Sequence, residues 1–339
     1  MTIYALSSGK GISGISVIRI SGSKTKEVIL KLTKRDLPNP RVATKRKFNK
    51  FNNNELIDEG ILIWFPGPMS YTGEDMAEFH VHGSKAVVDA MYKSISSIDD
   101  CRLAEPGEFT KIAFQNGKIN LLKAESISDL ISSETEIQRQ QAIKIMSGKN
   151  FDKFNSIRNR LLKILSSVEA KIDFPEEDLP TNLLNDIHFQ AKSIKEEIEK
   201  ILNDQKVGER IREGFKIAII GPTNAGKSSL LNYLSKRNVA IVSEIAGTTR
   251  DVIESHLNLD GYPVVLSDTA GIRDSKDEIE KKGIKLALNK AEYADLNIIV
   301  IDSKSIDFAS DFEHLALKNS IYVVNKTDLG VDKIKNQIK

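Results

Sequence analysis

The sequence contains a single cysteine, Cys101, no long apolar run and no large excess of either charge. One cysteine excludes an internal disulfide framework and a zinc site built from several cysteines, so Cys101 is expected to serve packing. No run of about 18 apolar residues occurs, and the N-terminus lacks the apolar core and cleavage site of a signal peptide. A net charge of +2 does not by itself indicate that the protein binds nucleic acid. These absences predict a cytoplasmic protein that does not cross a membrane.

The 339 residues, of which 40% are hydrophobic, predict two or three domains. Residues 1–118 carry short apolar runs bounded by Gly, Pro and Asn, which predict an α+β domain. Residues 119–212 show helical stripes, and the stripe from 154 to 168 is expected to face a core. Residues 213–339 alternate strands and helices in the doubly wound α/β pattern. The charged stretch 208–214 between the last two regions predicts a hinge.

A glycine-rich segment, residues 221–228 (GPTNAGKS), follows an apolar run and precedes a helical stretch. This order places backbone N–H groups and a helix N-terminus around phosphate oxygens. Lys227 adds positive charge, and Ser228 offers a hydroxyl to magnesium. A chance match in an ordinary strand-turn-helix is the alternative, and three later motifs argue against it. The segment therefore predicts a phosphate-binding P-loop.

Two of the later motifs have the character of nucleotide-sensing switches. Residues 247–251 (GTTRD) form a loop whose Thr249 can reach magnesium and the γ-phosphate. Residues 268–271 (DTAG) follow an apolar strand. In this motif Asp268 can hold the metal through water, and the N–H of Gly271 can bond the γ-phosphate. A hairpin with the turn Asp260-Gly261 is expected to join the two motifs.

The third motif, residues 325–328 (NKTD), follows another apolar strand. The carboxylate of Asp328 can accept hydrogen bonds from the ring N–H and the exocyclic amine of guanine, which adenine does not offer. Asn325 and Lys326 are expected to brace this loop. Together the motifs predict guanine recognition and GTP hydrolysis.

One expected residue is missing from the second switch. Many small GTPases place a glutamine after the DTAG motif to orient the attacking water, whereas this chain has Ile272. The amide oxygen of Asn224 could bind a potassium ion beside the β–γ phosphate bridge, where other GTPases use the positive charge of an arginine finger. The alternative is that Asn224 is a turn residue bonded to its own backbone.

Longer segments upstream resemble one known family. They are residues 14–22 (GISVIRISG), 64–75 (WFPGPMSYTGED), 78–83 (EFHVHG), 106–110 (PGEFT) and 116–118 (NGK). With the nucleotide motifs, they make essentially the whole chain similar to the MnmE (TrmE) family of tRNA-modification GTPases. The resemblance implies a multidomain fold: an α+β folate-binding and dimerisation domain (1–118), a helical domain (119–212) and a Ras-like α/β P-loop GTPase domain (213–339).

The resemblance also implies a tetrahydrofolate one-carbon donor in the first domain. Arg19, Glu78 and Lys118 match the family positions that contact it, and a carboxylate can read an aminopyrimidinone while basic groups hold a glutamate tail. Each of these residues is otherwise explained as a surface or ion-paired side chain. His80 and His82 alternate as one face of a strand would. They could form a metal pair, although packing or hydrogen bonding is the more ordinary reading.

For the nucleotide, the resemblance implies a potassium shell and a magnesium site. The potassium ligands would be Asn224, Ser243, Ile245 and Thr248, and the magnesium ligands Ser228 and Thr249. Glu280 matches the carboxylate proposed to activate water, with Thr249 as its catalytic companion. A glutamate on a helix surface is the alternative, and Glu278 stands nearby. The GTP-binding residues would be Asn224, Ala225, Gly226, Lys227, Ser228, Ser229, Ser243, Glu244, Ile245, Ala246, Gly247, Thr248, Thr249, Asp268, Thr269, Ala270, Gly271, Asn325, Lys326, Thr327 and Asp328.

The implied reaction adds a carboxymethylaminomethyl or aminomethyl group to the wobble uridine of certain tRNAs. Family members act as homodimers with MnmG, which contains FAD, in a heterotetramer. They continue past the NKxD motif to a last strand and helix, returning helices and a Cys-x-Gly-Lys motif, whereas this chain stops at Lys339. The expectation is a helical domain with only its first half and a truncated GTPase domain, from a fragment, a split gene or a decaying gene. A ribosome-assembly GTPase switch and an inactive remnant are the alternative functions.

Basic residues are concentrated in residues 24–50, which hold ten Lys or Arg side chains and two acidic ones, Glu27 and Asp36. Such a segment can contact RNA, and a solvated charged face is the alternative.

Overall fold

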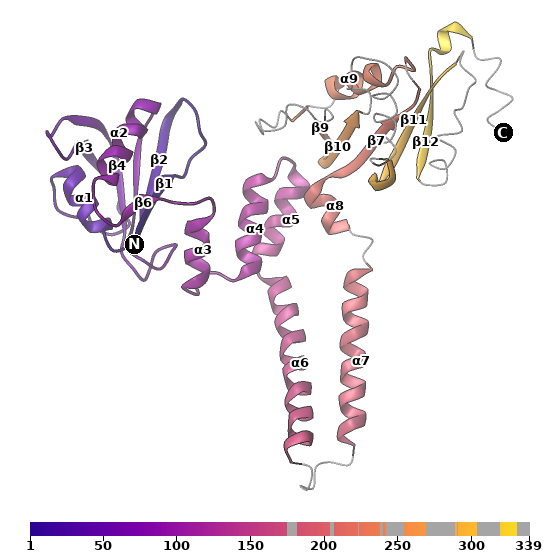
Figure 1. The fold of residues 1–339 in the computed structure, drawn as a ribbon, viewed down its shortest axis with the longest axis horizontal. Coiled ribbons are helices and arrows are strands. Elements are labelled where there is room, and N and C mark those ends of the chain that lie inside the picture. Colours follow the sequence, from indigo (N-terminus) through magenta and orange to yellow (C-terminus); the bar gives the residue numbers. More distant parts are fainter. Residues whose placement is uncertain are drawn as a thin grey trace. The chain divides into compact units, whose positions relative to one another are not determined.

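The structure, a computed structural model, describes residues 1–174, 182–203, 207–222, 224–237, 240–241, 254–268, 289, 291–303 and 319–330. Contacts divide the chain into two compact units, residues 1–125 and 126–339. Figure 1 shows the elements of both units, coloured along the sequence.

The first unit is built on a six-stranded sheet in the order β3-β4-β5-β2-β1-β6. The pairs are antiparallel except β1 with β6. The strands are β1 Thr2–Leu6, β2 Ser13–Ser21, β3 Thr44–Asn49, β4 Leu56–Phe65, β5 Met76–Gly83 and β6 Cys101–Leu103. The alternation of buried and exposed residues along β5 shows that one sheet face is the core face.

Helices α1 (Thr25–Thr33) and α2 (Lys85–Ser96) contribute to the same core as the sheet, and α3 spans Glu108–Gln115. Phe48 and Phe79 are fully buried there and meet edge to face, with ring centres 5.6 Å apart. Burying one such side chain stabilises the fold by about 1.5–3 kcal/mol. Cys101 packs against this core, and burial raises the pKa of its thiol. Its predicted packing role is confirmed.

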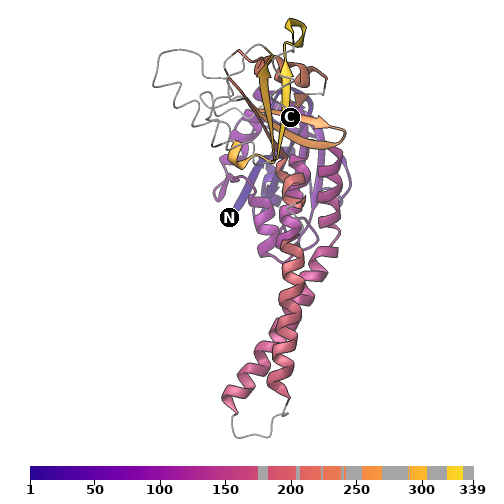
Figure 2. The same cartoon turned by 90° about the vertical axis from the view of Figure 1, so that its right-hand side faces the viewer.

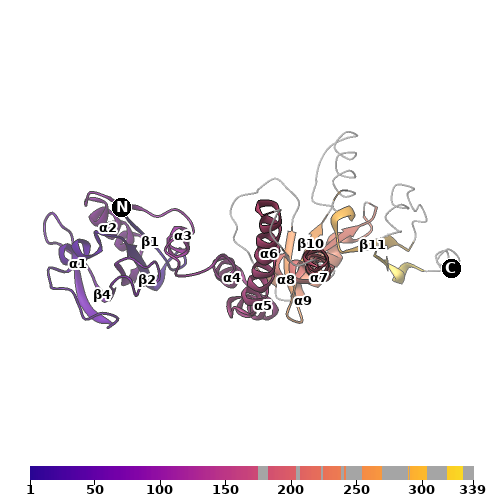
Figure 3. The same cartoon turned by 90° about the horizontal axis from the view of Figure 1, so that it is seen from below.

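The next helices are α4 Leu121–Ser132, α5 Glu136–Met146, α6 Lys149–Asp173, α7 Leu183–Leu202 and α8 Val207–Glu213. Thr135 begins α5 with a capping box, because its side chain accepts from Gln138 N–H and the Gln138 side chain accepts in return. The long helices α6 and α7 lie side by side (Figures 1 and 2), and Figure 3 looks along them. Nη1 of Arg160 and Oε2 of Glu197 join the pair at 2.6 Å.

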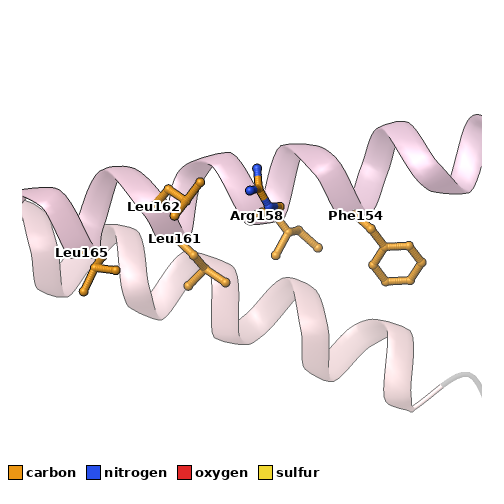
Figure 4. Close-up of a pocket in the computed structure, with 6 residues that line it drawn as sticks. Phe154, Arg158, Leu161, Leu162 and Leu165 are labelled. Atoms are coloured by element: carbon orange, nitrogen blue, oxygen red, sulfur yellow. The ribbon is translucent and has the colours of Figure 1, made fainter. Parts of the chain in front are cut away.

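The apolar stripe of α6 differs from the prediction that it faces a core. Among its described residues, Ile157 is buried at 6% exposure, whereas Phe154, Leu161 and Leu165 are 46–51% exposed. Figure 4 shows Phe154, Leu161 and Leu165 along one side of the helix, where they border a hollow of about 400 Å³. Periodicity correctly indicates an amphipathic helix, but it does not say what covers the apolar side. None of the helices in the described part of the chain combines the length and apolar composition that a membrane crossing requires.

Residues 208–213 of the predicted hinge belong to helix α8 (Val207–Glu213). Nε of Arg210 donates to Oδ1 of Asp295 at 2.7 Å, and Nε of Arg212 donates to Oδ1 of Asp129 at 2.8 Å. Gly214, with φ of 91°, ends the helix and turns the chain into the next strand. The charges that suggested a hinge therefore fasten α8 to its neighbours.

The second unit contains another six-stranded sheet, in the order β12-β11-β7-β10-β9-β8. β7 pairs in parallel with β11 and β10, β11 pairs in parallel with β12, and the pairs β10·β9 and β9·β8 are antiparallel. The strands are β7 Phe215–Ile220, β8 Ala240–Ile241, β9 Glu254–Leu259, β10 Tyr262–Asp268, β11 Leu296–Asp302 and β12 Ser320–Asn325, and helix α9 spans Lys227–Arg237.

The predicted hairpin between the two switch motifs is confirmed. Leu259 of β9 pairs with Tyr262 of β10 across the two-residue turn Asp260-Gly261. Both turn residues have positive φ, 49° and 90°. This is the turn geometry that an Asp-Gly pair favours, because it matches the twist of the flanking strands.

Candidate functional site

The glycine-rich loop leaves the sheet at the end of β7, between β11 and β10. Ile219 and Ile220 are fully buried there. Gly221 follows with φ of 150°, and a Cβ at this position would lie 2.2 Å from the carbonyl oxygen of Val300. No side chain fits in that space, so the strand must turn into the loop through a glycine.

A second close approach joins this loop to the end of β12. Nδ2 of Asn325 donates to the carbonyl oxygen of Ala225 at 2.8 Å, and Ala225 is fully buried. A Cβ on Gly226, whose φ is 99°, would lie 2.0 Å from the same Nδ2. The Ala225–Asn325 bond thus connects the predicted phosphate loop with the predicted guanine loop, and it depends on glycine at position 226.

Lys227 is the first residue of α9 and is only 8% exposed. Its Nζ donates to the carbonyl oxygens of Gly221 and Pro222, both at 2.9 Å. These bonds curl the loop around the ammonium group and satisfy part of its need for partners when buried. The positive charge therefore lies inside the loop, where a phosphate oxygen would form a stronger, charge-assisted bond.

Three predicted ligands in the loop and in the first turn of α9 face solvent. Asn224, Ser228 and Ser229 are exposed. Asn224 has φ of 60°, a conformation that Asn adopts more readily than most residues. This backbone fits the turn interpretation of Asn224, and its exposed amide is also accessible to a cation. Ser228 and Ser229 lie in the first turn of α9, where the helix dipole favours an anion.

Two partners of Lys326 were missed by sequence reasoning. Nζ of Lys326 lies 2.7 Å from Oδ2 of Asp302, and Oγ of Ser303 donates to the carbonyl oxygen of Lys326 at 2.6 Å. Asp302 ends β11 and pairs with Asn325 of β12. The register between these two parallel strands is the only signal that would have found them. These contacts hold Lys326 at φ of 59° and brace the loop.

Asp328 lies in the short 3₁₀ helix Thr327–Leu329 that follows. Its side chain is exposed, as is that of Thr327. The amide N–H of Leu329 donates to the carbonyl oxygen of Lys326 at 3.0 Å, which closes this turn. The carboxylate is therefore presented on a braced backbone and is open to a ligand.

Asp268, described by its backbone alone, is the last residue of β10 and lies opposite Ile219 of β7. Because parallel strands end at one edge of a sheet, Asp268 reaches the edge where the phosphate loop begins. The other predicted nucleotide-site residues lie outside the described residues: Ser243, Glu244, Ile245, Ala246, Gly247, Thr248, Thr249, Thr269, Ala270, Gly271 and Glu280.

In the first unit, Arg19 of β2 and Glu78 of β5 are direct cross-strand partners. Nε and Nη2 of Arg19 both donate to Oε1 of Glu78, at 3.0 and 2.7 Å. The guanidinium carbon lies 5.6 Å from the ring centre of Tyr71 and 5.7 Å from that of Phe109. The two charged side chains are 28% and 16% exposed, so the pair is held in place and still reaches solvent. The aromatic neighbours were not predicted.

Lys118 lies beside the segment that carries Tyr71. A Cβ on Gly73 would come within 2.9 Å of Cε of Lys118, so glycine leaves room for the lysine stem. Within the described residues, Lys118 makes no hydrogen bond or ion pair with Arg19 or Glu78. The structure therefore brings two of the three predicted folate contacts together directly, and places the third against a neighbouring loop.

His80 and His82 have separate partners. Nε2 of His80 lies 3.6 Å from Oε2 of Glu78, whereas Nδ1 of His82 lies 2.8 Å from Oδ1 of Asp58. Burial of Asp58 opposes ionisation, but hydrogen bonds from the His82 backbone N–H, the His82 ring and the Glu59 N–H hold the pKa of its carboxyl below its ordinary value. In the part of the chain that the structure describes, no three His, Cys, Asp or Glu side chains cluster as a metal site requires. Hydrogen bonding to Asp58 thus accounts for His82, whereas Nε2 of His80 is buried without a hydrogen-bond partner among the described residues.

A glycine loop encloses a lysine at the end of a central parallel strand, and this loop is hydrogen-bonded to an Asn-Lys-Thr-Asp loop on the same sheet. This combination defines the class of guanine-nucleotide-binding P-loop proteins. Residues 2–118 match the protein-family model described as GTP-binding protein TrmE N-terminus, and residues 121–339 match that described as MnmE helical domain. The chain belongs to the MnmE (TrmE) family.

Individual relatives agree with this family. The tRNA modification GTPase MnmE of Pelagibacter ubique (strain HTCC1062) is 72% identical over 339 residues, which cover 100% of this chain and 76% of that protein. The protein of the same name from Rickettsia typhi (strain ATCC VR-144 / Wilmington) is 49% identical over 331 residues, 97% of this chain and 74% of that protein. A crystal structure of an Era variant from Aquifex aeolicus bound to GDP.AlF4- is 30% identical, covers 36% of this chain and 46% of that chain, and has a TM-score of 0.29.

Proposed function

We propose that this chain hydrolyses GTP in the service of tRNA modification. The observation that carries the proposal is the Ala225–Asn325 bond, because it brings a phosphate loop and a guanine loop within reach of one nucleotide. Membership of a family whose relatives are named tRNA modification GTPases supports it. In this proposal Lys227 and the loop amides hold the phosphates, and Asp328 accepts two N–H bonds from guanine.

The residues around the phosphate loop fit a magnesium ion. The Ser228 hydroxyl is exposed in the first turn of α9, and Asp268 ends the neighbouring parallel strand. Hydroxyl and carboxylate oxygens are ligands that this hard cation accepts. Ser228 and Thr249 would hold the ion, with Asp268 acting through water. When bound, the ion would neutralise charge on the phosphate oxygens.

A potassium ion would supply, beside the β–γ phosphate bridge, the positive charge that an arginine finger supplies in other GTPases. The exposed amide of Asn224 fits this role, and Ser243, Ile245 and Thr248 would complete the shell. Glu280 would orient the attacking water, and Thr249 would close over the γ-phosphate. A fixed cation beside the developing negative charge lowers the barrier because it needs no reorganisation during the reaction.

GTP turnover is therefore expected to be faster in potassium chloride than in sodium chloride by about tenfold or more. Asn224→Ala should lower the rate in potassium to about the rate in sodium. Asn319→Ala removes an exposed asparagine just before β12 and should leave the ratio unchanged. Phosphate release measured in both salts gives the result, and equal wild-type rates would refute the potassium assignment.

The first unit fits a tetrahydrofolate derivative. Glu78 offers a fixed carboxylate that an aminopyrimidinone can donate to, and beside it the guanidinium of Arg19 contacts two aromatic rings. Lys118 would hold the negatively charged tail of the ligand. The bound donor would supply the one-carbon unit, while these side chains bind and orient it.

Glu78→Gln is expected to weaken tetrahydrofolate binding by about tenfold or more, since it removes a charge-assisted acceptor. The matched control is Glu108→Gln, because Glu108 also forms an ion pair with an arginine of the same unit, Arg102. Titration calorimetry with tetrahydrofolate compares the two variants. No folate binding by the wild-type chain would favour a ribosome-assembly GTPase over this proposal, and equal losses in both variants would remove Glu78 from the site.

The wider reaction follows from the family. We propose that the chain acts in the cytoplasm as a homodimer, in a heterotetramer with FAD-containing MnmG. The pair would add a carboxymethylaminomethyl or aminomethyl group to the wobble uridine of tRNA. In that scheme this chain binds folate and GTP, and the partner binds the redox cofactor.

A further inference from the structure

Charge is segregated within the first unit. Residues 24–50 hold ten basic and two acidic side chains, whereas the remainder of residues 1–125 holds eight basic and twelve acidic ones. A Lys-rich composition alone would spread the basic residues evenly. The excess instead falls on α1, on the loop that follows it and on β3, the edge strand of the sheet.

Two contacts join these elements at one place. Nδ2 of Asn49, the last residue of β3, donates to the carbonyl oxygen of Leu32 in the last turn of α1 at 3.4 Å. Nζ of Lys31 lies 6.0 Å from the ring centre of Phe51. The end of α1 and the end of β3 are therefore neighbours. We call the basic residues of this region the basic edge: Lys31, Lys34, Arg35, Lys45, Arg46, Lys47 and Lys50.

Some of this charge is balanced within the unit. Lys31 pairs with Glu27, Lys45 with Glu59 and Lys50 with Glu55, at 2.8, 3.0 and 2.8 Å. These are exposed pairs, which contribute little stability and exchange readily for another anion.

Four residues of the basic edge, Lys34, Arg35, Arg46 and Lys47, have no acidic partner among the described residues. Glu59 is the direct cross-strand neighbour of Lys47, but its carboxylate is bonded to Lys45 instead. The basic edge therefore keeps an excess of positive charge.

The backbone beneath these charges is fixed. The N–H of Lys34 donates to the carbonyl oxygen of Leu30 at 2.9 Å, and the N–H of Arg35 donates to Oγ1 of Thr33 at 3.3 Å. Lys31 and Lys34 also complement the dipole at the end of α1, which explains basic residues at those two positions. The helix dipole does not explain why Arg35 and Lys47 are basic.

We propose that the basic edge binds the phosphate backbone of the tRNA that this protein modifies, a proposal that rests on the proposed function. Lys45 and Lys47 project from one face of β3 about 6.6 Å apart, close to the spacing of successive phosphates along a strand. Clustered lysine and arginine side chains bind such a backbone by releasing its counterions, without reading sequence. The ligand class is therefore an RNA backbone, bound independently of the nucleotide and folate sites.

The test compares two triple variants of the full chain. The first, Lys34→Asn with Arg35→Gln and Lys47→Gln, removes three positive charges from the basic edge, and Asn tolerates the left-handed φ of 52° at position 34. The control, Lys85→Gln with Lys93→Gln and Lys111→Gln, removes the same charge from exposed positions on α2 and α3. Fluorescence anisotropy with an unmodified tRNA transcript gives Kd at several salt concentrations. GTP turnover and thermal unfolding of each variant are measured beside it.

The basic-edge variant should bind tRNA about tenfold or more weakly, and the slope of log K against log salt should fall by about 2 to 3. The control should bind as the wild type does. Equal losses in both variants, no loss in either, or binding to anionic lipid vesicles but not to tRNA would each overturn the proposal. If the wild-type protein binds tRNA but does not hydrolyse GTP, the result would instead count against the proposed function. The proposal that the basic edge binds RNA would be unaffected.

Discussion

Asp328→Asn is expected to weaken GTP binding by about a hundredfold or more. The carboxylate accepts two N–H bonds from guanine in the proposed site, and each charge-assisted hydrogen bond is worth about 1.5–3 kcal/mol. An Asn side chain keeps one acceptor and presents an N–H donor to the guanine amine, which is itself a donor. The substitution lies on an exposed side chain, so the fold should be unaffected.

The same variant should gain affinity for xanthosine triphosphate. Xanthine carries an oxygen where guanine carries the amine, so the Asn amide can donate to it and accept from the ring N–H. Binding of fluorescent GTP and XTP analogues measures the exchange. Asp260→Asn is the control, because it changes an exposed Asp in the β9–β10 turn to a residue that the turn accepts equally well. Undiminished GTP affinity in Asp328→Asn would place guanine recognition elsewhere.

Lys227→Met is expected to reduce GTP turnover by about a hundredfold or more. The variant keeps most of the apolar stem but removes the charge that the loop encloses, and losing one fixed donor to a developing charge costs about that much. It also removes the two bonds to Gly221 and Pro222, so some loss of loop order is expected. Nucleotide affinity and single-turnover rate separate the two effects.

The control for Lys227→Met is Lys216→Met, which removes an exposed lysine from the opposite end of β7. Its Nζ lies 2.8 Å from Oε2 of Glu213, a surface pair of small energetic weight. Thermal unfolding of both variants checks that the sheet is intact. A Lys227→Met protein that hydrolyses GTP at the wild-type rate would exclude the loop as the phosphate site.

Local patterns predicted the elements whose geometry is set within a few residues. The Asp260-Gly261 turn and the strand before the glycine loop follow from residue types that favour one backbone conformation. The apolar stripe of α6 likewise identified a helix. The expectation that this stripe is buried was wrong for most of its residues. An apolar stripe shows which side of a helix is hydrophobic, but it does not show which other element covers that side.

The sequence did not predict the contacts between segments that are far apart in the chain. Asp302 and Ser303 hold Lys326 only because β11 and β12 pair in one particular register. Arg19 contacts the rings of Tyr71, in the loop before β5, and Phe109, in α3, which are far apart in the chain. Residue types alone did not assign Arg19 and Glu78 to a site, and the resemblance to a family suggested that they share one. The resemblance did not indicate that they bond directly to each other.

The hydrogen bond from Asn325 to Ala225 spans 100 positions of the chain. During synthesis the phosphate loop leaves the ribosome first, and it must wait for β12 before this bond can close. Closing so long a segment has an entropic cost, which the pairing of β12 with β11 must offset. Maturation of the nucleotide site is therefore a late event in the folding of the second sheet, and a nascent chain gains the complete pocket only after Asn325 has docked.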